Sequence, residues 1–136
     1  MSPRLLIESV PVEPTKYQLA TIKRLYHDRL AERTHVERIV YRSDGLRVHG
    51  YCARPADPGV YPLLIWNRGG WGPRGSLDDL TAYLILASTA EWGYVVLATQ
   101  YRGVKGGEGV EDFGGDDVND AFNLLELAKE IPEADT

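Results

Sequence analysis

Hydrophobic and polar positions follow two rhythms along the chain, and the first of them is helical. Across residues 15–33, apolar side chains recur at intervals of three or four, and most charged side chains fall on the opposite face. Pro14 and Thr15 suit the start of a helix. The pattern therefore predicts one amphipathic helix over residues 15–33 that packs against another part of the molecule.

The second rhythm is the period of two that is typical of strands. Residues 36–41 and 46–53 alternate in this way, and the turn-forming sequence Ser-Asp-Gly at residues 43–45 lies between them. Two prolines and a glycine in residues 55–59 cannot continue a strand ladder. We therefore expect a β-hairpin that ends in a loop.

Two later segments are apolar without alternation. They are residues 94–98 and a run of four residues, Leu63, Leu64, Ile65 and Trp66. Strands covered by helices on both faces of a parallel sheet have this pattern. Both segments are therefore predicted to be buried parallel strands.

A helix is predicted after each buried strand. The first covers residues 77–92, with Ser76 and Asp79 resembling a capping box and Gly93 as the stop signal. The second covers residues 116–130 and follows a glycine-rich loop. A strand–helix–strand–helix order indicates the α/β class.

The predicted organisation has two parts. Residues 1–35 form an N-terminal segment with the amphipathic helix, and residues 36–136 form an α/β domain that is incomplete. A crossover helix leads to a further parallel strand, and no such strand is predicted after the second helix.

Composition narrows the class of partner. The net charge is −5 and the basic residues are dispersed, whereas nucleic-acid binding needs a clustered basic face. Cys52 is the one cysteine, so neither an internal disulfide nor a cysteine-based metal site is expected. The apolar patch at residues 5–7 is too short for a signal peptide or a membrane span. We therefore expect a cytoplasmic protein without nucleic-acid or membrane partners.

The residues of the chain form no recognisable active site. The loop at residues 67–76 has the glycine spacing of a phosphate-binding loop, but it lacks the lysine, and Pro73 removes a backbone donor. A phosphate-ligand site there is a weak alternative. No serine lies in a Gly-x-Ser-x-Gly context, and the three histidines share no metal-ligand spacing with a carboxylate. No cofactor or metal is expected.

Four segments together resemble the catalytic domain of serine hydrolases of the prolyl-oligopeptidase family. SDGLRVHGY (43–51) resembles the opening hairpin, and PLLIWNRGG (62–70) resembles the third strand with its oxyanion loop. GYVVLATQYRG (93–103) is similar to the fourth strand and its Arg-Gly turn, and EDFGGDDVND (111–120) to the start of the next helix. The segments occur in the family's order and cover about two thirds of the chain.

The resemblance implies the N-terminal part of an α/β-hydrolase sheet and serine peptidase or esterase chemistry for the complete domain. In this family the nucleophile lies after the next strand, and the aspartate and histidine follow later. The catalytic Ser, Asp and His would then all lie beyond Thr136. The substrate would be a peptide or an ester, this chain alone would be inactive, and a complementing C-terminal piece is a possible partner.

What this chain could contribute is the oxyanion hole, because one of its donors comes from the loop after the third strand. The candidates are Asn67, Arg68, Gly69 and Gly70. The family places a tyrosine at about the position of Asn67, so the donor could be the Asn67 amide or a backbone N–H. In the competing interpretation, Asn67 ends a strand and the glycines make a tight turn.

Two further expectations concern partners. The family's strand order leaves residues 63–66 as a sheet edge without a charge, proline or bulge. We therefore expect self-association through this strand, unless the predicted N-terminal helix covers it. The alternative to an enzyme part is a non-catalytic interaction module built on the same half-sheet.

Overall fold

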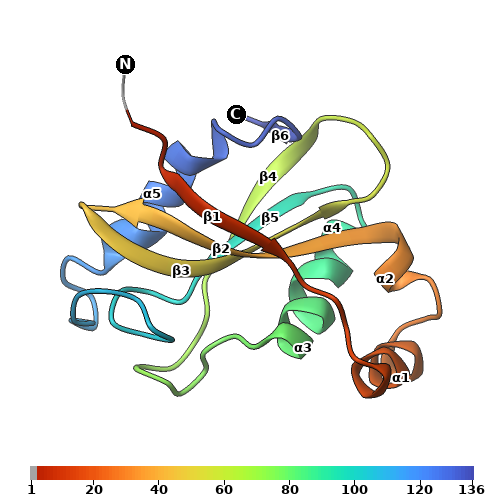
Figure 1. Cartoon of the computed structure of the whole chain (residues 1–136). Coiled ribbons are helices and arrows are strands. Elements are labelled where there is room, and N and C mark those ends of the chain that lie inside the picture. Colours follow the sequence, from red (N-terminus) through yellow and green to blue (C-terminus); the bar gives the residue numbers. More distant parts are fainter. Residues whose placement is uncertain (1–2) are drawn as a thin grey trace.

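The structure is a computed structural model that describes residues 3–136, and a curled six-stranded sheet runs through it (Figure 1). The strand order is β1-β2-β3-β5-β4-β6. The strands are β1 (Leu6–Pro11), β2 (Thr34–Ser43), β3 (Leu46–Pro55), β4 (Tyr61–Trp66), β5 (Val95–Thr99) and β6 (Ala134–Asp135). The β1–β2, β2–β3 and β3–β5 pairs are antiparallel, and β4 lies parallel to both β5 and β6.

The predicted hairpin is β2–β3, which pairs continuously from Thr34↔Pro55 to Ser43↔Leu46. Its turn is made by Asp44 and Gly45, whose φ angles are 50° and 79°. Positive φ at both central residues defines the turn that matches the twist of a two-residue hairpin, and Asp-Gly favours it. The prediction from the Ser-Asp-Gly signal is confirmed.

The two apolar runs form β4 and β5, and all five residues of β5 are buried. β5 lies between β3 and β4, as the strand order of the resembled family implies. The expected α/β class is therefore confirmed.

Helices cover both faces of the sheet (Figure 1). They are α1 (Lys16–Leu25), α2 (Leu30–Arg33), α3 (Asp79–Thr81), the π-helical turns η1 (Ala82–Ala87), α4 (Ser88–Ala90) and α5 (Val118–Ala128). α3, η1 and α4 form one continuous helical segment on one face. α5 lies on the opposite face.

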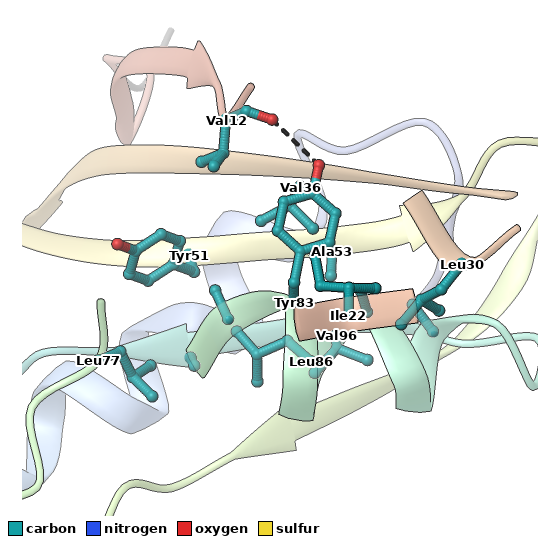
Figure 2. Packing of buried hydrophobic residues seen from close by; sticks show 14 residues of the cluster. Val12, Ile22, Leu30, Val36, Tyr51, Ala53, Leu77, Tyr83, Leu86 and Val96 are labelled. Carbon is teal, nitrogen blue, oxygen red and sulfur yellow. Dashed lines mark hydrogen bonds between the residues drawn. The ribbon is translucent and has the colours of Figure 1, made fainter. Parts of the chain in front are cut away.

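On the first face, η1 packs against the sheet, and α2 contacts η1 and β2. Figure 2 shows Tyr83 reaching from η1 toward β1, where its hydroxyl donates to the Val12 carbonyl at 3.0 Å. Ile22 and Leu30 bring α1 and α2 into the same core, and both are 1% exposed. The N-terminal segment is thus part of the core on this face.

On the second face, Leu124 and Leu127 of α5 are fully buried against Val95 and Leu97 of β5. Cys52 belongs to this cluster, and burial raises the pKa of its thiol to about 12. Cys52 therefore packs as a small buried apolar residue.

The single predicted helix over residues 15–33 is wrong in its continuity, because α1 ends at Leu25 and α2 begins at Leu30. The start is as expected: Thr15 caps the helix in a reciprocal capping box with Gln18. The break follows from tertiary contacts that no local pattern encodes. The Tyr26 hydroxyl donates to the Leu84 carbonyl, and His27 contacts Glu91 of the opposite helical segment at 2.7 Å.

The other predicted helices are shorter than expected. The first begins at Asp79, capped by Asp78, which accepts from the Thr81 N–H at 2.7 Å, so the expected start at Ser76 is wrong. That backbone hydrogen bond also lowers the pKa of Asp78. The helix ends before Gly93, whose φ of 103° suits the predicted stop. The second helix spans the 11 residues of α5 rather than residues 116–130.

Two strands were not predicted. β1 pairs with β2 through a register that shifts once, between Leu6 and Glu8. β6 pairs Ala134 with Tyr61 and Asp135 with Pro62. The expectation that no strand follows α5 is therefore wrong for these two residues, although the β6 pairing extends along β4 no further than Pro62.

Within residues 3–136, the structure contains no helix that is both long and apolar enough to cross a bilayer. The division into parts at residues 35 and 36 stays a prediction.

Candidate functional site

The candidate site lies where β4 and β5 end side by side. The two strands are parallel and pair from Leu63↔Val95 to Trp66↔Ala98, so the loops that follow them leave the sheet at the same edge. Open α/β sheets bind their ligands in the crevice outside the carboxyl ends of the strands. The four candidate residues, Asn67 to Gly70, begin the loop after β4.

Asn67 is exposed and contacts the loop after β5. The Tyr101 hydroxyl donates to Asn67 Oδ1 at 3.3 Å. Tyr101 has a φ of 68°, which is uncommon for a residue with a side chain and costs about 1–3 kcal/mol. Burial raises the pKa of the Tyr101 hydroxyl above its ordinary value.

Arg68 has a different environment from the other three candidates, because its side chain is fully buried. Nε donates to the Gln100 carbonyl at 3.1 Å, Nη1 to the carbonyls of Gly69 and Arg74, and Nη2 to the Gly72 carbonyl at 2.9 Å. The guanidinium also lies over the Tyr101 ring, 5.6 Å from its centroid. Through these contacts the Arg68 side chain stabilises the conformation of the loop.

Gly69 and Gly70 are exposed, and their backbone N–H groups have no hydrogen-bond partner within residues 3–136. Two neighbouring N–H groups at a strand end are the kind of donor from which oxyanion holes are built. The candidates thus divide into one loop-shaping side chain, Arg68, and three donors: the Asn67 amide and the N–H groups of Gly69 and Gly70.

The loop crosses itself so closely that only glycine fits at two positions. A Cβ on Gly70 would lie 2.0 Å from the Arg74 carbonyl oxygen, and one on Gly75 would lie 2.1 Å from that of Gly69. Both residues also have positive φ, 83° and 77°. The glycine spacing that resembles a phosphate-binding loop therefore closes a tight backbone crossing.

The phosphate-ligand alternative finds no support in this geometry. The Gly72 N–H donates to a carboxylate oxygen of Glu111 at 2.6 Å, so a protein side chain already holds this donor. The helix that follows begins at Asp79, beyond the loop, and an aspartate caps it.

A second buried cluster lies beside the site, where the hairpin turn meets the start of α5. Asp120 is fully buried and accepts from the Arg102 backbone N–H at 2.7 Å and from its guanidinium at 2.8 Å. The Ser43 hydroxyl donates to the same carboxylate at 2.6 Å. The hydrogen bonds of Asp120 raise the pKa of Arg102 further above its ordinary value. All of these groups are satisfied by one another, which indicates a structural cluster.

An apolar groove of about 350 Å³ lies between the end of β4, Tyr101 and α5, and Asn67 is the one candidate residue in its lining. Its lining combines strand, loop and helix residues, namely Ile65, Asn67, Tyr101, Val118, Ala121, Phe122 and Leu125. Three of the α5 side chains are exposed: Val118 by 39%, Phe122 by 62% and Leu125 by 46%. An exposed apolar stripe on a helix beside an open strand edge indicates a surface that is suited to further packing.

The structure does not assemble a nucleophile with a base. The hydroxyls of Ser76 and Ser88 donate to backbone carbonyls, and Ser9 and Ser43 contact carboxylates. Within residues 3–136, no serine is hydrogen-bonded to a histidine. Sequence reasoning missed two residues that shape the site, Gln100 and Glu111, because their roles depend on contacts between separate loops.

The chain is similar to known hydrolases. No protein-family model matches it. It is 43% identical over 94 residues to the uncharacterized peptidase YtmA of Bacillus subtilis (strain 168), a match that covers 69% of this chain and 35% of that protein. The chain thus spans about a third of the length of this relative.

Solved structures show the same fold. A crystal structure named as a hydrolase from Legionella pneumophila superposes with a TM-score of 0.61 and 18% identity, covering 96% of this chain and 41% of the other. Brefeldin A esterase, a bacterial homologue of human hormone-sensitive lipase, gives 0.55 and 18%, covering 93% and 40%. Acetyl xylan esterase 1 from Thermoanaerobacterium sp. JW/SL YS485 gives 0.50 and 19%, covering 77% and 38%.

The chain has the N-terminal part of an α/β-hydrolase fold. The expected resemblance to peptidases and esterases of this fold is confirmed. Asn67, Gly69 and Gly70 lie in the loop after β4, and their role as oxyanion donors stays a prediction.

Proposed function

We propose that this chain is the N-terminal part of a serine hydrolase related to the prolyl-oligopeptidase family. The complete domain cleaves amide or ester bonds through an acyl-enzyme, and the chain supplies part of the oxyanion hole. The catalytic Ser, Asp and His come from outside residues 1–136, so the chain is inactive alone. The observation that carries the proposal is a vacant strand position beside β4 that leads to the candidate donors.

The backbone of β4 defines this position. The Tyr61 N–H donates to the Glu133 carbonyl at 2.7 Å, so the backbone groups of Tyr61 are directed toward β6. Successive residues of a strand direct their backbone groups to opposite sides, so those of Leu63 and Ile65 face the same way as those of Tyr61. The Pro62↔Asp135 pair engages the Leu63 N–H, and within residues 3–136 no strand pairs with Ile65 on that side.

A strand that continues the parallel register of β6 fits this position. Ala134 pairs with Tyr61 and Asp135 with Pro62, so the following residues of such a strand would lie opposite residues 63–66. Its apolar side chains would cover the groove formed with Phe122 and Leu125. The turn after such a strand would lie beside Asn67, where a nucleophile can meet the donors. Losing one oxyanion donor costs about a hundredfold or more in rate, so this juxtaposition is chemically significant.

The test is covalent labelling by a fluorophosphonate probe. We expect no labelled serine in the isolated chain. We expect stoichiometric labelling and hydrolysis of an activated ester after co-expression with the part of the Bacillus subtilis peptidase that lies outside the match. A labelled serine in the isolated chain would contradict the proposal, as would a soluble, folded complex that neither labels nor hydrolyses the ester.

The second candidate function is a non-catalytic interaction module, and the same open edge favours it. Residues 63–66 carry no charge, proline or bulge, and such edges pair with other strands. We propose that the isolated chain self-associates through this edge at tens of micromolar. A stable monomer by sedimentation velocity would contradict this.

A pair of proline variants tests the edge directly. Ile65→Pro removes an N–H that faces outward, whereas Leu64→Pro removes one that faces β5. Ile65→Pro is therefore expected to yield a folded monomer, and Leu64→Pro to destabilise the sheet. Association that survives in folded Ile65→Pro would assign the contact to another surface.

A further inference from the structure

The loop after β4 and the loop after β5 are held together at the candidate site by a set of contacts centred on the Arg68–Glu111 ion pair. We call this set of contacts the lock. Nη2 of Arg68, in the loop after β4, lies 3.4 Å from Oε1 of Glu111, in the loop after β5. The side chains are 0% and 10% exposed. Water therefore screens this pair little, and both groups lose hydration when it forms.

Glu111 binds the loop in two ways. One carboxylate oxygen contacts Arg68, and the other accepts the Gly72 N–H at 2.6 Å. Arg68 in turn donates to the Gly72 carbonyl at 2.9 Å. The ion pair therefore holds both backbone groups of Gly72, which lies two residues after Gly70.

The other end of the lock is fixed to α5. Asp117, which precedes α5, is 4% exposed and accepts from the backbone N–H groups of Asp112 and Gly114 at 3.2 and 3.1 Å. These bonds order the backbone that carries Glu111. Exposed aromatic rings add a second contact between the loops, since Trp71 meets Phe113 edge-on at 6.5 Å.

The arrangement leaves the candidate donors free while fixing the backbone around them. Arg68 and Glu111 use the carbonyls of Gly69, Gly72 and Arg74 and the N–H of Gly72, but not the N–H groups of Gly69 and Gly70. Fixed donors that need no reorganisation during the reaction are what makes an oxyanion hole effective.

We propose that Glu111 is a positioning residue, which acts through Arg68 and Gly72 to preset the oxyanion loop. This inference rests on the proposed function. It predicts a site whose donors are in place before substrate binds. Disturbing the lock should lower kcat and change KM little, because the donors act on charge that develops only in the transition state.

The first readout uses the isolated chain. In the wild type, the Gly72 amide is expected to exchange slowly with deuterium in NMR spectra. Glu111→Ala is expected to remove this protection while amides of β5 keep theirs. Glu111→Gln keeps an acceptor for Gly72 but loses the charge that faces Arg68, so partial protection is expected. Asp116→Asn, an exposed carboxylate in the same loop, is the matched control. Fast Gly72 exchange in the wild type would overturn the lock.

The second readout uses the chain complemented with the remaining part of the Bacillus subtilis peptidase. Glu111→Ala is expected to lower kcat by about 10- to 100-fold, as small misplacements of reacting groups do, with KM within about threefold. Glu111→Gln should recover part of the loss, and Asp116→Asn should match the wild type. An active complex in which Glu111→Ala keeps full kcat would overturn the inference. A folded complex without any labelling would instead overturn the proposed function, and Gly72 exchange would still test the lock.

Discussion

Two buried arginines follow neighbouring strands at the same edge of the sheet, and they have opposite kinds of partner. Arg102, after β5, contacts the carboxylates of Asp120 and Asp44, both at 2.8 Å. Arg68, after β4, donates mainly to backbone carbonyls and meets its carboxylate, Glu111, at the longer distance of 3.4 Å. One arginine is neutralised by two charges at close range, whereas the other is solvated by its own loop.

The sequence separation of the partners differs as well. Arg102 joins the hairpin turn, β5 and α5, since Asp44 is 58 residues away along the chain. Gly69, Gly72 and Arg74 lie within six residues of Arg68. Arg102 therefore connects elements of the fold, whereas Arg68 stabilises the loop after β4 and connects it to the loop after β5. The difference shows that burial of a charge does not by itself indicate whether it serves the fold or a site.

The largest expected effect that tests this difference between Arg102 and Arg68 comes from removing each guanidinium in turn. Arg102→Met leaves the Asp120 carboxylate buried without its cation, which typically costs about 3–5 kcal/mol of unfolding free energy. Urea denaturation is expected to show this loss. Asp116→Ala, an exposed carboxylate one turn away, should stay within about 0.5 kcal/mol of the wild type. A loss below 1 kcal/mol for Arg102→Met would mean that Asp120 finds other partners or water.

The elements around these arginines differ in how well the sequence predicts them. The hairpin turn, β4 and β5 follow from local patterns, namely Asp-Gly at a two-residue turn and continuous apolar runs in buried strands. β1 has no such pattern, because its last four residues are exposed and both Glu8 and Pro11 occur in it. Its pairing with β2 is a non-local contact. β6 has only two residues and is defined entirely by its partner, β4.

The candidate site was predictable to the extent that it lies in one segment. Asn67 to Gly70 follow a recognisable strand in a recognisable order, and their oxyanion role is what the family resemblance predicts. The contacts of the buried Arg68 side chain were not predictable, because its carboxylate partner, Glu111, lies 43 residues away in another loop. Glycine is required at positions 70 and 75 because the backbone crosses itself closely there. The phosphate-loop spacing of these glycines does not reveal this requirement.

Removing the other guanidinium is expected to have a smaller effect. Arg68→Met removes the cation beside Glu111 and the donor to the buried Gln100 carbonyl, but Glu111 keeps the Gly72 N–H at 2.6 Å. The other carbonyls that Arg68 binds lie in a loop that water can reach. We expect a loss of about 1–2 kcal/mol in the same urea experiment. Amide exchange should rise in the loop after β4 and not in α5. Arg68→Met could lower the unfolding free energy as much as Arg102→Met, or the amides of α5 could also lose protection from exchange. Either result would show that the loop after β4 unfolds with the core, and it would contradict the difference drawn between the two arginines.

The smallest expected effect concerns the pH dependence of stability. The hydrogen bond from Arg102, followed by those from Asn119 and Asn123, holds the pKa of Asp44 below its ordinary value of 3.8. A carboxylate with a lowered pKa in the folded state stabilises the protein at all pH values above the ordinary pKa. This contribution is lost as the pH falls through the lowered value.

Asp44→Asn isolates this charge, because asparagine also tolerates the positive φ of 50° at this turn position. Asp44 is 39% exposed, so solvent screening limits the expected difference from the wild type to under about 1 kcal/mol at pH 7. The difference in unfolding free energy should stay constant from pH 7 to about pH 5 and shrink below about pH 4. In the Arg68→Met background the same pH profile is expected, because Arg68 is not among the groups that hold Asp44. A profile that flattens when Arg68 is removed would show that the two arginine centres are coupled and do not act as separate units.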